Sequence, residues 1–242
     1  MKTEATAMLL DFGERQVSYR LHRQTRLNLR LIVTPDLAVN VYAPVSYSDQ
    51  AIAMVVRKKA LWITRSLDRM RAFHPLPSPK HYVSGETFMY LGRQYRLRVQ
   101  EGRPSPCRLY GRFLTVTVRA KSAGHLVRSA VEQWYVTHAA QIFTQRMTKC
   151  HAIAARHGVS TPQLVFRRMR TRWGSCTRTD RITLNIHLVQ TPIHCVDYVI
   201  MHELCHMTHH DHSRAFYSFL ARCMPDWQQR KQVLNQISLL AV

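Results

Sequence analysis

Alternating apolar and polar residues in the first part of the chain predict β-strands. The pattern covers residues 17–23, 28–35 and 37–44, and each segment ends in residues that favour turns. Residues 48–73 then place apolar side chains at helical spacing behind Ser48, a favourable helix cap, which predicts one long helix. The next stretch, 74–80, has three prolines in seven residues and is expected to be a loop.

Strand patterns return in residues 87–100 and 107–120, where Gly92 and Gly111 mark the turns of two hairpins. A long amphipathic helix is expected over residues 122–157. Two further strand patterns then enclose a loop, and helices follow to the end of the chain. The strands are 164–169 and 181–189; the helices are 193–209, begun by Pro192, then 213–224 and 226 onward.

This order of elements predicts an α+β fold. The strand-rich subdomain covers residues 1–120 and the helical part covers 121–242. We expect the two to form one continuous domain, because 242 residues are enough for a single large core. No internal repeat is evident in the sequence.

The chain is strongly basic, and this charge favours certain classes of binding partner. It has 35 Lys and Arg against 14 Asp and Glu, a formal net charge of +21. Such a field attracts phosphate groups of nucleic acid, nucleotides or anionic lipid surfaces, although net charge alone is not specific. The start of the chain does not have the pattern of a signal peptide, and no apolar run reaches the roughly 18 residues that span a bilayer. We therefore expect a cytoplasmic protein without a membrane partner, whose six scattered cysteines are mostly buried thiols.

A histidine-rich stretch, MHELCHMTHHDH over residues 201–212, carries the clearest chemical signal. His202 and His206 are four residues apart on an expected helix, so both imidazoles leave the same face, as two ligands of one tetrahedral zinc ion require. Glu203 lies between them, where its carboxylate can act as general base for an attacking water rather than as a ligand. The helix ahead of the pair is apolar, and buried histidines are costly without partners. The stretch therefore predicts a Zn²⁺ site.

A catalytic zinc ion needs a third protein ligand and keeps its fourth position open. His212 gives the spacing HExxH-x5-H, in which a short turn after the helix returns a third imidazole to the metal. His209 and His210 compete for this position, although a continuing helix would displace the ring of His210 by a turn. Cys205 is expected to pack in the core rather than to bind the metal.

Two blocks of the sequence carry a family resemblance. Residues 171–192 contain an Arg-Trp-Gly-Ser-Cys turn and an I-x-L-N strand, and residues 197–227 contain Y-V-x-x-H-E-L-x-H, the third histidine, S-x-x-F and a late Pro-Asp pair. In these features the chain resembles the YgjP-like metallopeptidases of bacteria. The resemblance implies a zincin-like fold, zinc on His202, His206 and His212, and Glu203 as the catalytic residue. Related zincins of the SprT type act on proteins bound to DNA, which makes a nucleic-acid-associated protein a candidate substrate.

Six arginines with a single acid, Asp180, lie in residues 167–181, which hold the Arg-Trp-Gly-Ser-Cys turn. In a zincin this segment forms the upper rim of the cleft, where an extended peptide can add as a strand. We expect Arg170, Arg172 and Trp173 near the substrate, and backbone amides around Gly174 as donors to a developing oxyanion. The alternatives are a buried Trp173 that anchors the turn, arginines that are only solvated, and a Cys176 that only packs.

Three functions are compatible with these features. The first is a zinc-dependent metallopeptidase that hydrolyses peptide bonds. The second is a phosphohydrolase that uses the same zinc and the arginines on a nucleoside triphosphate. The third is a nucleic-acid-binding module with a structural zinc ion, which predicts a closed site with four protein ligands and no need for Glu203. The oligomeric state does not follow from the sequence.

Overall fold

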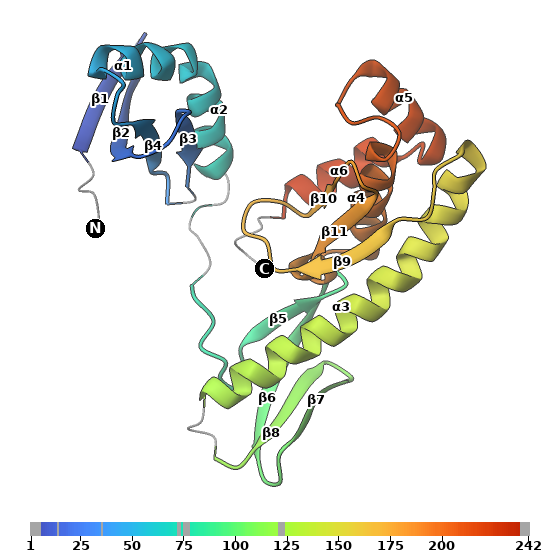
Figure 1. Ribbon diagram of the computed structural model, residues 1–242. Coiled ribbons are helices and arrows are strands. Elements are labelled where there is room, and N and C mark those ends of the chain that lie inside the picture. Colours follow the sequence, from blue (N-terminus) through green and yellow to red (C-terminus); the bar gives the residue numbers. More distant parts are fainter. Residues whose placement is uncertain are drawn as a thin grey trace. The chain divides into compact units, whose positions relative to one another are not determined.

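Two four-stranded sheets with the same strand order dominate the computed structural model of the chain (Figure 1). The structure describes residues 6–13, 15–34, 36–71, 74, 78–120 and 124–237. The chain separates into two units, Met1–Pro77 and Ser78–Val242, each with its own core. The division therefore lies in the proline-rich segment rather than at residue 120, because the strands that follow this segment share a core with the helices after them.

The first unit consists of one sheet and two helices. Its strands are β1 (Thr6–Phe12), β2 (Arg15–Gln24), β3 (Arg30–Val33) and β4 (Val39–Pro44), in the order β1-β2-β4-β3. The outer pairs are antiparallel and the central pair, β2 and β4, is parallel. Helices α1 (Asp49–Lys58) and α2 (Ala60–Arg71) contribute Ile52, Val56 and Ile63 to the core beneath the sheet.

Two expectations for this unit are corrected. Strand β1 was not predicted, because only Leu10 of its seven residues is buried and an edge strand of this kind lacks a clear apolar face. The single helix predicted over residues 48–73 is interrupted at Lys59, whose φ of −99° and ψ of 3° are not helical. Residues 72 and 73 of that prediction lie outside the described part of the chain.

The second unit begins with the other sheet, which β5 (Thr87–Tyr90), β6 (Arg93–Glu101), β7 (Ser105–Tyr110) and β8 (Phe113–Val118) form in the order β5-β6-β8-β7. Both predicted hairpins are confirmed, and Gly92 and Gly111 occupy their turns with φ of +78° and +56°. As in the first unit, the central pair is parallel and the outer pairs are antiparallel. The chain thus repeats a strand arrangement that its sequence does not reveal.

Helix α3 (Gly124–Ala154) packs against β7 and β8 and also against the helices that follow (Figure 1). Beyond it come a 3-10 turn η1 (Ala155–His157) and a small sheet of β9 (Gln163–Arg167), β10 (Gly174–Cys176) and β11 (Arg181–Asn185), in the order β10-β11-β9. The last elements are η2 (Ile186–Gln190), α4 (Ile193–His206), α5 (Arg214–Cys223) and α6 (Trp227–Asn235). The fold is α+β, as predicted.

The predicted strand over residues 181–189 ends early. The side chain of Asn185 accepts a hydrogen bond from the backbone N–H of His187, and this cap turns the chain into η2 after residue 185. Apolar residues Ile186, Leu188 and Val189 are buried in the 3-10 turn, so their pattern resembled that of a strand. Part of the loop expected before it, Gly174–Cys176, is strand β10, which pairs with β11.

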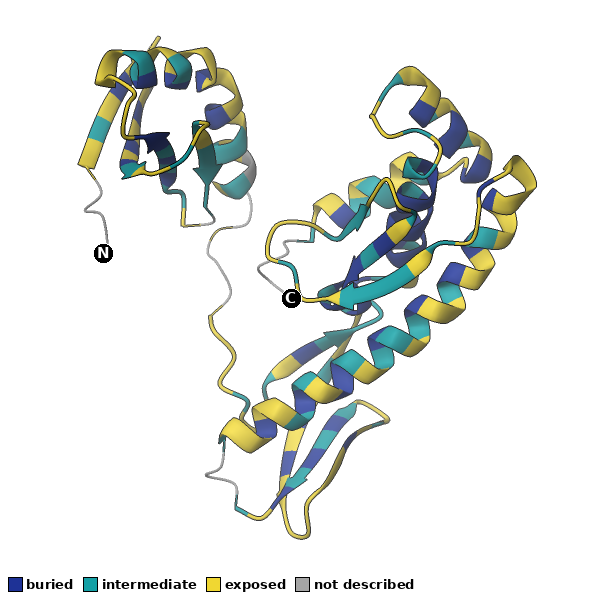
Figure 2. Cartoon of the chain, viewed as in Figure 1, coloured by how far each residue is buried: buried dark blue, intermediate teal, exposed yellow. Residues whose placement is uncertain are grey.

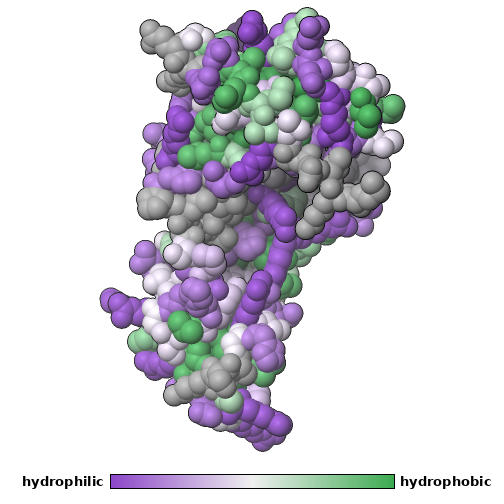
Figure 3. All heavy atoms as spheres, turned by 90° about the vertical axis from the view of Figure 1, so that its left-hand side faces the viewer, coloured by the Kyte–Doolittle hydropathy of each residue, from purple (hydrophilic) through white to green (hydrophobic). Residues whose placement is uncertain are grey.

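One continuous core runs through the second unit. It extends from Leu97 and Leu114 in the sheet, through Phe143 of α3, to Ile200 of α4 and Phe216 of α5. Figure 2 colours buried residues dark blue, and in this unit they occur on the sheet and on the helices that pack on it. Strongly hydrophilic residues cover much of the side drawn in Figure 3, with apolar residues in separate patches between them. Among the described residues, no helix has the length and apolar character that crossing a membrane requires.

Candidate active site

Helix α4 positions the central residues of the candidate site. Pro192 occupies its N-cap, and the helix then buries an apolar run that includes Val196, Val199 and Ile200. The helix packs against α3, α5, α6 and β10, which fixes its position. His202, Glu203 and His206 stand on its last turn and a half, where the side chain of Glu203 is only 6% exposed. A burial of this kind is costly for a carboxylate and calls for a partner.

His202, His206 and His212 converge on one point. Their three Nε2 atoms are each 3.2 Å from the other two. A tetrahedral zinc ion with Zn–N bonds of about 2.0–2.1 Å requires nitrogens about 3.3–3.4 Å apart, so this triangle fits the ion closely. Among the described residues, the group that could hold a metal ion has these three members and no fourth His, Cys, Asp or Glu.

Hydrogen bonds alone do not explain the triangle. The Nδ1 atom of His206 faces the backbone carbonyl of His209 at 2.9 Å and must donate to it, which leaves Nε2 of the neutral ring as an acceptor. At most two of the three Nε2 contacts can then carry a hydrogen. A cation bound by three lone pairs satisfies all of them, and a fixed tautomer of this kind is typical of metal-ligating histidine.

The ring of Phe216 on α5 packs against the imidazole rings of all three histidines. It is fully buried, and its ring centroid lies 4.6 Å from that of His206 and 5.0 Å from those of His202 and His212. Ser213 caps α5 by accepting the N–H of Phe216, which fixes this ring next to the turn that carries His212. Phe216 is the aromatic residue of the S-x-x-F pattern, so the sequence contained a signal for it.

The Nδ1 atom of His202 is buried and has no hydrogen-bond partner in the described part of the chain.

Glu203 lies against strand β10. A side chain at Gly174 would place its Cβ 2.7 Å from Oε1 of Glu203, so only glycine allows the strand and the carboxylate to approach each other this closely. Burial raises the pKa of Glu203 to about 8, while the charge of Arg172 and a hydrogen bond from the backbone of Cys176 act in the opposite direction. The carboxylate therefore has a fixed position and a proton affinity near neutrality.

Strand β10 is the outer strand of its sheet, and one of its edges pairs with no other strand of the described residues. Thr177 donates to the carbonyl of Arg181, and Asn185 donates to the carbonyl of Trp173, so Ser175 and Thr183 form the hydrogen-bonded pair between them. The N–H and C=O groups of Gly174 and Cys176 then point away from β11. Since β10 is the outer strand of its sheet, these groups lie at the edge of the sheet, and there the N–H of Cys176 donates to Glu203.

A pocket joins the metal-binding group to this edge. Its lining combines the strand, the ligand helix and α6: Trp173, Gly174, Tyr198, Val199, His202, Glu203, Lys231, Leu234 and Asn235. Tyr198, Lys231 and Asn235 were not singled out in the sequence. The apolar pattern predicted α6 as a helix, but no sequence feature showed that this helix forms a wall of the pocket.

The predicted rim residues differ in their surroundings. Trp173 is half-buried, packs on the core and also lines the pocket, while Arg172 is exposed and close enough to Glu203 to influence its pKa. Arg170 is exposed and is not among the residues that line the pocket. Arg168 is paired with Glu132 of α3 at 3.0 Å and lines a different pocket. Thus the arginines of residues 167–181 do not gather on one surface.

The remaining candidates lie beside the metal-binding group. His209 contributes its backbone carbonyl, and its ring contacts Phe219 instead of the triangle. His210 is exposed. Cys205 is fully buried and packs in the core, and burial raises the pKa of its thiol. Cys176 is half-buried with a thiol pKa raised to about 11, so at neutral pH it is protonated.

Asn185 holds the rim segment in place from inside the protein. Its fully buried side chain donates to the carbonyls of Met169 and Arg172 at 2.7 and 3.0 Å. Its Oδ1 accepts the backbone N–H groups of Met169 and His187. The backbone that enters β10 is therefore fixed by one amide, whatever the outward side chains do.

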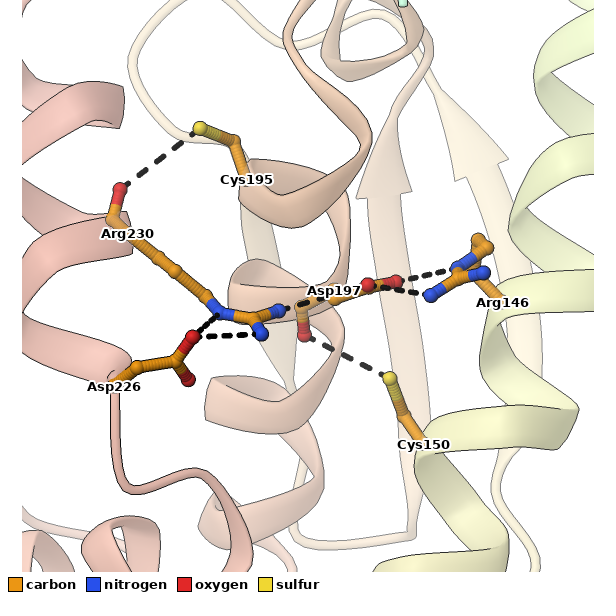
Figure 4. A network of polar contacts seen from close by, with 6 residues as sticks. All are labelled: Arg146, Cys150, Cys195, Asp197, Asp226 and Arg230. Atoms are coloured by element: carbon orange, nitrogen blue, oxygen red, sulfur yellow. Dashed lines mark hydrogen bonds and ion pairs between the residues drawn. The ribbon is translucent and has the colours of Figure 1, made fainter.

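An ion-pair network fixes the other end of α4 (Figure 4). Asp197 accepts two hydrogen bonds from Arg146 of α3, at 2.6 and 2.5 Å, and lies 3.6 Å from the guanidinium of Arg230 of α6. Asp226 pairs with the same Arg230 at 2.9 Å. The carboxylate of Asp197 is only 9% exposed, so the network connects the ligand helix to both neighbours in a partly buried setting.

The comparison with known proteins gives one clear match. A family model described as YgjP-like, metallopeptidase domain, matches residues 27–237. The match includes every residue of the site described above and most of the first unit. Among curated proteins, none matches the chain.

Proposed function

The chain belongs to the YgjP-like metallopeptidase family, and on this premise we propose that it is a zinc-dependent peptidase with His202, His206 and His212 as ligands and Glu203 as general base. The observation that carries the proposal is the triangle of three Nε2 atoms, each 3.2 Å from the others, with Glu203 in the same pocket. Three ligands without a fourth protein group favour a catalytic site over a structural one.

Bound there, Zn²⁺ would act as a Lewis acid that polarises the scissile carbonyl and makes water more acidic. Glu203 would take the proton of the attacking water on its carboxylate and deliver it to the leaving amine. Burial raises the pKa of this carboxyl group to about 8, which helps it to hold the proton between the two steps, and the positive charge of bound Zn²⁺ would lower this pKa so that the carboxylate could accept the proton first. The close approach of Gly174 keeps the carboxylate in this position.

The outer edge of β10 would bind the substrate as an additional strand. Gly174 directs its backbone N–H and C=O groups and Cys176 its C=O away from β11, and such groups pair with an extended peptide irrespective of its side chains, while the N–H of Cys176 donates to Glu203. Trp173 and Arg172 flank this edge and would contact the substrate side chains next to the scissile bond. A protein bound to nucleic acid is the substrate class that suits the net charge of +21.

The variant Glu203→Gln tests the proposal. It should lower the kcat for casein or for a DNA-bound protein by roughly 100- to 10,000-fold, the usual contribution of a general base, while zinc content measured by mass spectrometry stays at one per chain. Glu101→Gln is a matched control, because Glu101 is exposed and lies at the end of β6. Retained activity of Glu203→Gln would contradict the assigned role.

The same preparation separates peptidase from phosphohydrolase activity. Nucleoside triphosphates are supplied in parallel with the protein substrates, and release of phosphate is measured beside release of peptides. We expect peptides only. Phosphate release that Glu203→Gln abolishes, without peptide cleavage, would replace this proposal with the phosphohydrolase.

A further inference from the structure

The sheet β5–β8 has one face that α3 does not cover. Leu97, Val99, Leu114 and Val116 point to the core with α3, so the alternate residues of the same strands form the opposite face. We refer to this set as the outer face. It consists of Thr87 and Met89 on β5, Gln94, Arg96, Arg98 and Gln100 on β6, Arg108 and Tyr110 on β7, and Phe113, Thr115 and Thr117 on β8.

The outer face is basic and carries no acid. Arg96, Arg98 and Arg108 are exposed, and in the described part of the chain none of them forms an ion pair. This contrasts with the arginines of α3 and α6, which pair with Glu132, Asp197 and Asp226. Arg96 and Arg98 are neighbours on β6, and Arg108 lies two strands away on β7, so unpaired guanidinium groups are spread over this face and favour an extended polyanion.

Aromatic rings lie between these arginines. The guanidinium of Arg98 lies 3.7 Å from the ring centroid of Phe113, and Arg96 is the residue opposite Phe113 on the neighbouring strand. Tyr110 pairs with Phe113 across the hairpin turn and is 85% exposed, unusually high for a tyrosine on a strand. Phe113 is half-buried, whereas Tyr110 is an exposed ring next to unpaired arginines, the combination on which unpaired bases stack.

The first unit has a similar combination on the equivalent strands. On the uncovered face of its sheet, the rings of His22 and Tyr42 are stacked at 4.7 Å, and Arg30 is the residue opposite Tyr42 on the other side. Arg20 is exposed two residues before His22 on β2. Strands β2 and β4 correspond to β6 and β8 in the common strand order, so the basic and aromatic face occurs twice.

We propose that the outer face of β5–β8 binds single-stranded nucleic acid, with Arg96, Arg98 and Arg108 on phosphates, Tyr110 under a base, and Phe113 holding the guanidinium of Arg98 in position. A duplex fits less well, because its bases are already stacked and the sheet presents no helix or ribbon that could enter a groove. The proposal concerns a surface that shares no residue with the metal-binding group and does not depend on hydrolysis.

Fluorescence anisotropy with labelled oligonucleotides of about 15 nucleotides, the upper size of one such platform, tests the proposal on the zinc-loaded full chain. The variant Arg96→Ser/Arg98→Ser/Arg108→Ser should weaken binding of single-stranded DNA and RNA at least tenfold. The slope of log K against log[salt] should decrease in magnitude by about 2, because three phosphate contacts are lost and each contributes roughly 0.7. The control Arg57→Ser/Arg65→Ser/Arg156→Ser removes the same charge from exposed helical and 3-10 positions and should change affinity less than threefold.

Tyr110→Ser tests the stacking separately and should not affect folding, because the ring is 85% exposed. We expect at least fivefold weaker binding to a base-containing strand and no change for an abasic strand, since one stacked base contributes about 1–3 kcal/mol. Equal losses in both triple variants would reduce the effect to net charge and overturn the proposal. So would duplex binding as tight as single-strand binding, or equal dependence of phosphatidylserine vesicle binding on the same three arginines.

Discussion

The two four-stranded sheets share a strand order, yet their inner faces meet different partners. In the first unit, β1–β4 close a small core with α1 and α2, and every buried apolar residue of that core belongs to the first 67 residues. In the second unit, β5–β8 pack on α3, whose other contacts reach η2 and α4, so one core extends from the sheet to the metal-binding group. The same arrangement thus forms a separate unit in one place and the base of a candidate active site in the other.

The length of the helix that covers each sheet, α3 in one unit and α1 and α2 in the other, accounts for much of this difference. Helix α3 has 31 residues, against 10 and 12 in α1 and α2. A helix of that length extends well beyond a sheet of short strands, and its remaining turns are free to pack on α4. Its buried residues accordingly continue from Val127 to Ala154.

The largest expected effect on stability comes from creating a cavity in each core. Phe143→Ala, on α3, should lower the free energy of unfolding by about 3–5 kcal/mol and also weaken zinc binding, because α3 supports α4. Ile63→Ala, equally buried in α2, should cost about 2–5 kcal/mol in the first unit and leave zinc affinity unchanged. Urea unfolding and zinc titration measure both. Equal loss of zinc affinity in the two variants would show that the cores are coupled.

An intermediate effect is expected from the ion pairs that connect helices to their neighbours. Asp197→Asn leaves Arg146 without its carboxylate in a partly buried setting and should cost about 3 kcal/mol. Asp49→Asn breaks the pair between α1 and Arg23 of β2, where Asp49 is 66% exposed, and should cost less than about 1 kcal/mol. Thermal unfolding of the two variants gives the comparison. A similar shift in both would mean that burial does not set the difference.

The smallest effect concerns two equivalent turns. Gly92, between β5 and β6, has a φ of +78°, and a Cβ there would lie 2.8 Å from Cγ and 3.0 Å from Cα of Pro192 at the start of α4. Gly13, between β1 and β2, has a φ of +60° and nothing within 4 Å. Gly13→Ala should cost about 1 kcal/mol from the left-handed backbone alone, and Gly92→Ala about 2 kcal/mol. Equal costs, measured by urea unfolding, would mean that the β5–β6 turn does not press on α4.

The sequence predicted much of the fold because local patterns determined it. Both hairpins of the second sheet follow from Gly92 and Gly111, and the parallel partners β9 and β11 follow from their apolar runs. What local patterns do not contain is strand order, so the repeated arrangement was missed. Strand β10 was also missed, since three residues with small side chains carry no strand signal of their own and depend on pairing with β11.

For the candidate site, spacing predicted the residues on one helix and its following turn. His202, Glu203, His206 and His212 lie within eleven consecutive residues, so their geometry depends mostly on α4 and the turn to α5. Lys231 and Tyr198 reach the pocket through packing between distant elements, which no pattern in the chain encodes. The arginine-rich segment was expected to act as a whole, but ion pairing draws Arg168 toward Glu132, a residue 36 positions earlier.

Asn185 has a consequence for how this protein can change over time. Because its amide holds the backbone of Met169 and Arg172 from within, the exposed side chains of that segment contribute little to keeping the rim in position. Substitutions at a position such as Arg170 can therefore alter which substrates are attracted while the strand edge beside Glu203 stays where it is, whereas loss of the charge of Arg172 would also raise the pKa of Glu203. New specificities are accessible by single steps that leave the catalytic geometry intact, both to natural selection and to a designer who randomises the rim.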